Sequence, residues 1–126
     1  MKLPTLFRLA KRISEKSNMN PKVGAVLHLD KQTLTGYNKE KTHPKFANPE
    51  KHIRKSLHAE LDCLSKCEVF PDVMADWEIY VYREVHGKPA MARPCNHCMK
   101  FIRESGIISR IYYTIPHEPF WESEEI

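Results

Sequence analysis

Two short stretches of the chain hold side chains that could build a metal-dependent reaction centre. The first is His58-Ala59-Glu60, and the second is Pro94-Cys95-Asn96-His97-Cys98. Together they contribute one imidazole, two thiols three residues apart and a carboxylate close to the imidazole. Zinc prefers nitrogen and sulfur ligands in tetrahedral geometry, and a catalytic zinc keeps its fourth position for water. We therefore predict that His58, Cys95 and Cys98 bind Zn²⁺ and that Glu60 acts as the catalytic proton carrier.

Both stretches must open a helix if these side chains are to converge. Cys95 and Cys98 stand at i and i+3 at the start of a helix predicted over residues 96–105, so both sulfurs lie on one face. A helix N-terminus also favours the thiolate forms that bind metal. His58 begins a second predicted helix, which runs to about residue 67. If the two N-termini are adjacent, Glu60 can point at a metal-bound water from the first turn.

Other cysteines and histidines leave an alternative open. A closed, purely structural zinc site would need a fourth ligand, and His97, Cys63 or Cys67 could supply it. Cys63 and Cys67 are four residues apart and could also form a separate metal pair, although buried apolar cysteines are commoner. We expect burial for both, and a solvent-facing or hydrogen-bonding role for His97.

Composition is that of an ordinary globular protein. The 126 residues are 41% hydrophobic and 29% charged, which predicts one domain over residues 1–126. No apolar stretch is long enough to span a membrane, and the start leads into an amphipathic segment, so we expect a cytoplasmic protein. Four cysteines then favour free thiols over disulfides. The net charge of +4 fits an anionic substrate such as a nucleotide, and equally an ordinary solvated surface.

Hydrophobic periodicity predicts an α-β-β-α-β-α-β order. The helices are expected over residues 3–16, 58–67 and 96–105, and the strands over residues 23–29, 33–37, 77–83 and 107–115. A basic loop is expected over residues 38–57 and a short loop around Gly87 and Pro89. The last two strands should be parallel neighbours joined by a right-handed crossover, with helices on both faces of a mixed sheet. The form of residues 116–126 is left open.

The order H-x-E and then P-C-x-x-C resembles the signature of zinc deaminases. The chain resembles the zinc-dependent cytidine and deoxycytidylate deaminase superfamily, and its small phage-type members in particular, over most of its length. The likeness includes Gly24-Ala25-Val26 and Gly36-Tyr37-Asn38. It implies a three-layer α/β/α fold, shortened at the C-terminus because only residues 114–126 follow the last strand. These residues would form a short substitute strand, or a second subunit would cover the edge, since the family is usually oligomeric.

The resemblance also implies a reaction and further site residues. Hydroxide adds to C4 of cytosine, Glu60 protonates N3 and then the amine, and ammonia leaves to give uracil, with no organic cofactor. Asn38 would hold the sugar, the backbone N–H of Ala59 the pyrimidine carbonyl, and the backbone carbonyl of Pro94 the leaving amine. Lys41 and His43, within Lys41-Thr42-His43-Pro44, would face the substrate.

Three functions are compatible with these patterns. The favoured one is deamination of a small-molecule cytosine nucleotide or nucleoside, with a dCMP-like substrate, by a homo-oligomer. A second keeps the chemistry but acts on a base in single-stranded nucleic acid or tRNA, for which Phe46, Phe120 and Trp121 are stacking candidates unless they pack within the protein. A third is a zinc-stabilised binding protein without turnover.

Overall fold

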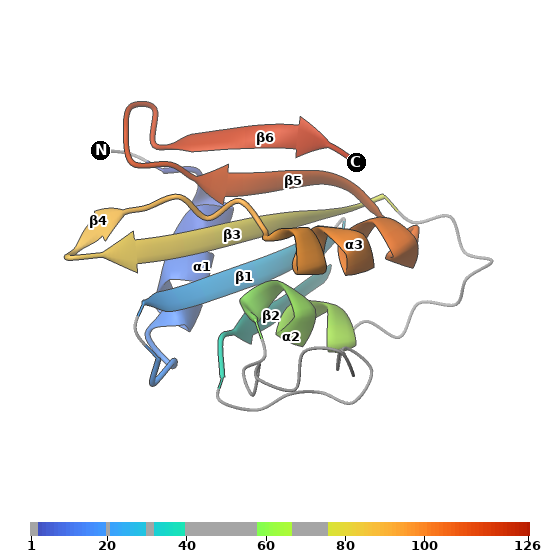
Figure 1. The fold of residues 1–126 in the computed structure, drawn as a ribbon, viewed down its shortest axis with the longest axis horizontal. Coiled ribbons are helices and arrows are strands. Elements are labelled where there is room, and N and C mark those ends of the chain that lie inside the picture. The colour runs from blue at the N-terminus through green and yellow to red at the C-terminus, as the bar shows by residue number, and fades with distance from the viewer. Residues whose placement is uncertain (1–2, 20, 30–31, 40–57, 67–75) are drawn as a thin grey trace.

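The central feature of the computed structural model is a mixed β-sheet (Figure 1). The structure describes residues 3–19, 21–29, 32–39, 58–66 and 76–126. Within these ranges the sheet has six strands, and five of them follow the order β2-β1-β3-β5-β6. Their bounds are β1 Lys22–Leu29, β2 Gln32–Tyr37, β3 Trp77–Val85, β5 Ile108–Thr114 and β6 Trp121–Glu125. The β3–β5 pair is parallel, as the sequence predicts, and the other pairs are antiparallel.

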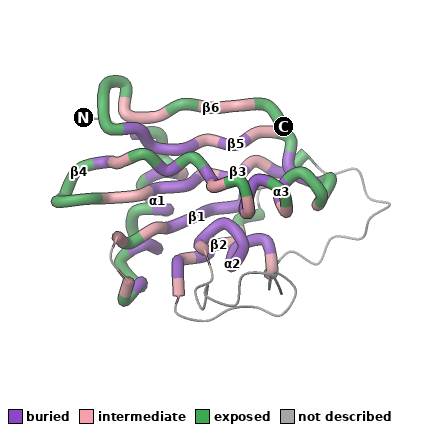
Figure 2. The backbone as a smooth tube through the Cα atoms, viewed as in Figure 1, coloured by how far each residue is buried: buried purple, intermediate pink, exposed green. Residues whose placement is uncertain are grey.

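Helices cover both faces of this sheet and make the molecule three-layered, which confirms the predicted fold class (Figures 1 and 2). One face carries α1 (Thr5–Ser14), and the other carries α2 (Ala59–Ser65) and α3 (Asn96–Ser105). Side chains alternate between the faces along each strand. Val26 and Tyr82 pack toward Phe7 of α1, whereas Val81 belongs to the core under α2 and α3. None of the helices that the structure describes is long and apolar enough to cross a membrane.

Two glycines bring helices into direct backbone contact with the sheet. A Cβ added to Gly24 of β1 would lie 2.0 Å from the carbonyl oxygen of Ala10 in α1. A Cβ added to Gly36 of β2 would lie 2.6 Å from the carbonyl oxygen of Ala59 and 2.5 Å from the backbone nitrogen of Cys63, both in α2. No other residue type leaves this space empty. Gly36 therefore sets how closely α2 approaches the sheet.

A hairpin replaces the short loop that the sequence predicts after β3. The strand β4 (Lys88–Pro89) pairs antiparallel with β3, with Val85 opposite Lys88. The two turn residues between them, His86 and Gly87, have φ of 52° and 76°. Positive φ at both positions is typical of a type I′ turn, which matches the twist of a tight hairpin. The loop prediction was wrong because β4 is only two residues long and contains a proline, so no alternating pattern marks it.

The C-terminal residues form a strand of their own. After β5 the chain turns at Pro116–Phe120 and returns as β6, antiparallel to β5, with Thr114 opposite Trp121. The tail thus forms the short substitute strand, which was the first of the two arrangements expected for it. Trp121 packs against Phe7 and Tyr112, with ring centroids 6.2 and 6.1 Å away. Trp121 and the half-buried Phe120 belong to the α1-side cluster, while Phe46 lies outside the described residues.

Candidate active site

The three predicted metal ligands meet at the adjacent N-termini of α2 and α3. His58 is the N-cap residue of α2 and Cys95 is the N-cap residue of α3, both in extended conformation, and Cys98 lies in the first turn of α3. Nδ1 of His58 is 3.1 Å from Sγ of Cys98 and 3.8 Å from Sγ of Cys95. All three ligand atoms lie within 4.8 Å of one another. The structure therefore brings together side chains that are up to 40 residues apart in sequence.

These distances suit zinc. With Zn–S near 2.3 Å and Zn–N near 2.0–2.1 Å, tetrahedral geometry separates a sulfur from a nitrogen ligand by about 3.6 Å. The two observed sulfur–nitrogen separations, 3.1 and 3.8 Å, lie on either side of this value. Small side-chain rotations would equalise them, so the donor set fits the ion chemically and geometrically.

The two thiols also need a cation nearby if they are to ionise. The interaction with Cys95, together with burial, raises the pKa of the Cys98 thiol well above its ordinary value. Two sulfurs in one partly desolvated site cannot both carry negative charge without compensation. A divalent metal supplies that compensation and displaces both protons.

No fourth ligand joins this group in the ranges that the structure covers. Cys63 is buried, as expected, and its thiol donates a hydrogen bond to the carbonyl oxygen of Leu34 at 3.1 Å. His97 lies edge-on to the ring of Phe101, with centroids 5.2 Å apart. Cys67, the remaining alternative, lies outside the described residues. The described part of the site is thus a three-ligand arrangement, which suits a catalytic zinc better than a closed structural one.

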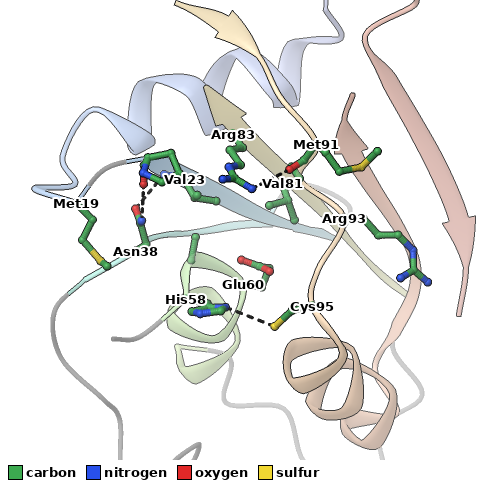
Figure 3. Close-up of a pocket in the computed structure, with 13 residues that line it drawn as sticks. Met19, Val23, Asn38, His58, Glu60, Val81, Arg83, Met91, Arg93 and Cys95 are labelled. Carbon is green, nitrogen blue, oxygen red and sulfur yellow. Dashed lines mark hydrogen bonds between the residues drawn. The ribbon is translucent and has the colours of Figure 1, made fainter. Parts of the chain in front are cut away.

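Glu60 is a buried carboxyl group that faces the same cavity (Figure 3). Only 5% of the residue is exposed. Burial raises its pKa above the ordinary value of 4.5, although a backbone hydrogen bond and the nearby His58 oppose this shift. A carboxyl group whose pKa is moved toward neutrality can both take up and release a proton during a reaction. This is the property that the predicted role of Glu60 requires.

A cavity of about 270 Å³ opens beside the ligands and is lined by two of the predicted substrate-contact residues. Asn38 and Ala59 line it. Ala59 is the first residue of α2, where backbone N–H groups have no acceptor within the helix. Pro94 is buried next to Cys95 but is not among the lining residues. Lys41 and His43 lie outside the described residues.

The Asn38 side chain is already engaged by the protein. Its Oδ1 accepts a hydrogen bond from the backbone N–H of Val23 at 2.9 Å, and its Nδ2 donates one to the carbonyl oxygen of Pro21 at 2.8 Å. These bonds tie the end of β2 to the beginning of β1. An amide has two further hydrogen-bonding positions, so the predicted contact with a sugar remains open to Asn38, in a fixed orientation.

Sequence reasoning missed two groups of residues near the site. Arg83, Met91 and Arg93 line the cavity from the β3–β4 hairpin and the segment after it. The sequence held one clue to Arg83: in β3 it occupies the same face as Ile79 and Val81, where a charged residue is unusual. Asp62 in α2 is the other: its carboxylate accepts a hydrogen bond from the backbone N–H of Tyr37 and pairs with Lys39 at 3.0 Å.

Comparisons with known proteins agree with this geometry. The sequence pattern of the cytidine and deoxycytidylate deaminase zinc-binding region matches residues 2–115. No curated protein sequence matches the chain. The dCMP deaminase of cyanophage S-TIM5 in its apo form is 24% identical, with 90% of this chain and 82% of that chain covered and a TM-score of 0.60. The same enzyme in complex with dCMP and dUMP is 23% identical over 88% of this chain and 79% of that chain, with a TM-score of 0.58.

A bacterial structure is also similar in fold. Cytidine deaminase from Burkholderia pseudomallei is 21% identical, covers 99% of this chain and 93% of its own, and has a TM-score of 0.67. The three-layer fold agrees with the family pattern matched over residues 2–115, and that match defines a deaminase of the zinc-binding class. The chain belongs to the cytidine and deoxycytidylate deaminase family, whose members are hydrolytic enzymes.

Proposed function

We propose that the protein is a zinc-dependent hydrolytic deaminase of a free cytosine nucleotide or nucleoside, with dCMP-like substrates favoured. One observation supports this above the others: His58, Cys95 and Cys98 converge within 4.8 Å beside a cavity into which the buried Glu60 points. This arrangement combines a metal site and a proton carrier in a partly desolvated space. A binding protein without turnover would have no use for the buried carboxyl group.

His58, Cys95 and Cys98 would hold the zinc ion. When bound there, zinc supplies Lewis-acid activation of the water that adds to C4 of cytosine. Glu60 takes one proton from that water and delivers it to N3 of the ring. Glu60 then transfers the second proton from the new hydroxyl group to the amino nitrogen, so that the C4–N bond breaks and ammonia leaves. Water and the cytosine compound are consumed, and the uracil compound and ammonia are formed.

The cavity wall would orient the substrate during these proton transfers. The backbone N–H of Ala59 would donate to the pyrimidine carbonyl, and the carbonyl of Pro94 would face the departing amine. Asn38, held by its two backbone hydrogen bonds, would contact the sugar. Lys41 and His43 are assigned to the substrate side by the family resemblance.

The substitution Glu60→Gln tests the proposal. It keeps the size of the side chain but cannot exchange a proton with water, so turnover should fall by at least about a hundredfold. The assay is ammonia release from dCMP, CMP, dCTP, deoxycytidine and cytidine by zinc-loaded protein, with zinc content measured by elemental analysis. Glu104→Gln, on the exposed side of α3, is the matched control and should leave activity unchanged. Failure of the wild-type protein on every substrate, or an unchanged rate for Glu60→Gln, would refute the proposal.

The proposal extends to assembly and location. Family resemblance points to a homo-oligomer that works in the cytoplasm on a small-molecule substrate. Light scattering coupled to size-exclusion chromatography gives the mass in solution directly. A monomer that deaminates dCMP at full rate would remove the oligomer from the proposal without affecting its chemistry.

A further inference from the structure

Two arginines line the cavity, and their surroundings differ. Arg93 donates to both carboxylate oxygens of Glu124, at 2.6 Å from Nε and 3.3 Å from Nη2, so a protein anion already neutralises it. Within the described ranges, the guanidinium of Arg83 makes one long hydrogen bond, from Nη1 to the carbonyl oxygen of Met91 at 3.4 Å. Among the residues that the structure describes, no carboxylate lies within 4.0 Å of the Arg83 guanidinium. Arg83 is therefore a cation in the cavity wall without a counter-charge from the described part of the chain.

The backbone of Arg83 is fixed by its neighbours. Its N–H donates to Oγ1 of Thr114 at 3.2 Å, and its carbonyl oxygen accepts from the N–H of Ala90 at 2.9 Å. Thr114 is fully buried and its hydroxyl group donates to the carbonyl oxygen of Ala90 at 2.8 Å. The β3–β4 hairpin and β5 thus hold this residue from two sides. A side chain on such a rigid support is pre-organised for a ligand, because little ordering is left to occur on binding.

The guanidinium also has unused hydrogen-bonding capacity. Nε of Arg83 is buried and has no hydrogen-bond partner among the residues that the structure describes, and the group carries five N–H donors in all. A buried donor without an acceptor is energetically unfavourable. Occupation of the cavity by an anion would draw on the remaining donors and supply the missing counter-charge. A guanidinium fork matches the oxygens of a phosphate group better than it matches a neutral hydroxyl group.

The position of Arg83 indicates which end of the substrate it would meet. In Figure 3 its side chain enters the cavity from β3, on the side away from His58 and Cys95, with Glu60 between them. A cytosine ring whose C4 lies at the metal end would direct its sugar away from the ligands. We infer that Arg83 determines substrate specificity by binding the phosphate group of a free cytosine nucleotide. This inference rests on the proposed deaminase function and assigns it a preference for nucleotides over nucleosides.

Comparison of dCMP with deoxycytidine tests the inference, because the two differ only in the phosphate group. For the zinc-loaded wild-type protein, kcat/KM should be higher for dCMP. Arg83→Gln should lower kcat/KM for dCMP about 10- to 100-fold, mainly through KM, since a charge-assisted hydrogen bond is lost. The same substitution should change the value for deoxycytidine less than about threefold. Arg83→Lys, which keeps the charge, should recover part of the loss.

Controls separate this inference from the deaminase proposal. Arg8→Gln, an exposed arginine of α1 on the other face of the sheet, removes the same charge and should leave both substrates unaffected. A dCTP arm shows whether one phosphate group suffices, and binding of dUMP against deoxyuridine by calorimetry reports on Arg83 without any turnover.

Several results would overturn the inference. These are equal wild-type efficiency on dCMP and deoxycytidine, an equal loss on both for Arg83→Gln, or dUMP binding no tighter than deoxyuridine. Preferential deamination of cytosine in a single-stranded oligonucleotide would also overturn it. Absence of turnover on every substrate, with dUMP still binding more tightly than deoxyuridine in an Arg83-dependent manner, would reject the deaminase function and keep the phosphate contact.

Discussion

Replacement of Gly36 by alanine should weaken metal binding, because the added methyl group would push on the backbone of α2, the helix whose N-terminus carries His58. The added Cβ would lie 2.6 Å from the carbonyl oxygen of Ala59 and 2.5 Å from the nitrogen of Cys63, whereas ordinary contact begins at 3.4 Å. Either the helix or the strand must therefore move by about 0.9 Å to bring the shorter of these distances to 3.4 Å. Overpacking of this kind destabilises a protein by about 1–3 kcal/mol. The first turn of α2 carries His58 and Glu60, so the displacement reaches the site directly.

A metal site tolerates much less movement than this. Ligand distances are held to about 0.2 Å in well-formed sites, and a misplacement near 1 Å can lower catalytic efficiency about a hundredfold. We therefore expect Gly36→Ala to bind zinc at least about tenfold more weakly, in competition with a chromophoric chelator, and to lose about a hundredfold in kcat/KM. Urea unfolding of the same sample gives the accompanying loss of stability.

Gly24→Ala is the matched control for this experiment. Its Cβ would lie 2.0 Å from the carbonyl oxygen of Ala10, so the clash is at least as severe, but it is with α1 on the other face of the sheet. This variant should lose stability while the folded fraction keeps its zinc affinity. If Gly36→Ala retained wild-type zinc affinity and activity, the close approach of α2 to β2 would not be what positions the ligands. The same conclusion would follow if both variants lost zinc equally.

Two further predictions concern ion pairs around the site. Asp62→Asn keeps the shape of the side chain but removes the charge that holds Lys39 at 3.0 Å. Urea unfolding should therefore show a free energy of unfolding that is lower by about 2 kcal/mol. An unchanged midpoint would mean that this buried carboxylate does not stabilise the fold. The pKa of Glu124 is lowered by its hydrogen bond to Arg93, so this pair stabilises the folded state above the unfolded-state pKa and stops doing so as pH falls through the folded-state pKa. The stability difference between wild type and Glu124→Gln should therefore be below about 1 kcal/mol near neutral pH, because the pair is partly exposed. It should diminish as the pH falls below 4.5, the ordinary pKa of a glutamate. A difference that grows on acidification would contradict the assignment.

Much of the fold could be predicted because the elements carry regular patterns. The helix over 96–105 ends at Gly106, whose φ of 68° is the left-handed conformation expected of a helix C-cap. The parallel β3–β5 pair follows from the strand–helix–strand order. The hairpin strand β4 could not be predicted, because two residues cannot display an alternating pattern. The form of β6 was equally hidden, since its sequence Trp-Glu-Ser-Glu-Glu is nearly all polar and only its pairing with β5 makes it a strand.

The site shows the same division between local and long-range information. His58, Cys95 and Cys98 could be named from spacing, because the first turn of a helix fixes the relative positions of neighbouring residues. The strand pattern shows which face of the sheet Arg83 occupies, but its place at the cavity also depends on Thr114 of β5 and on the hairpin that follows β3, which local spacing does not reveal. Asp62 forms a local i,i+4 ion pair with Lys66 at 3.8 Å, which sequence spacing could suggest, but its contacts with Tyr37 and Lys39 span more than 20 residues and could not be read from spacing.

Because the candidate ligands come from two helices that are far apart in sequence, a zinc ion bound to them would be a cross-link as well as a cofactor. His58 and Cys98 are separated by 40 residues of chain, and an ion bound to both joins α2 to α3. An ion that binds only the native protein stabilises it in proportion to the logarithm of the free ion concentration. Each tenfold rise in free zinc above the dissociation constant thus adds about 1.4 kcal/mol to the unfolding free energy. With zinc as the bound ion, a cell that restricts its zinc would lower both the catalytic capacity of this protein and its resistance to degradation.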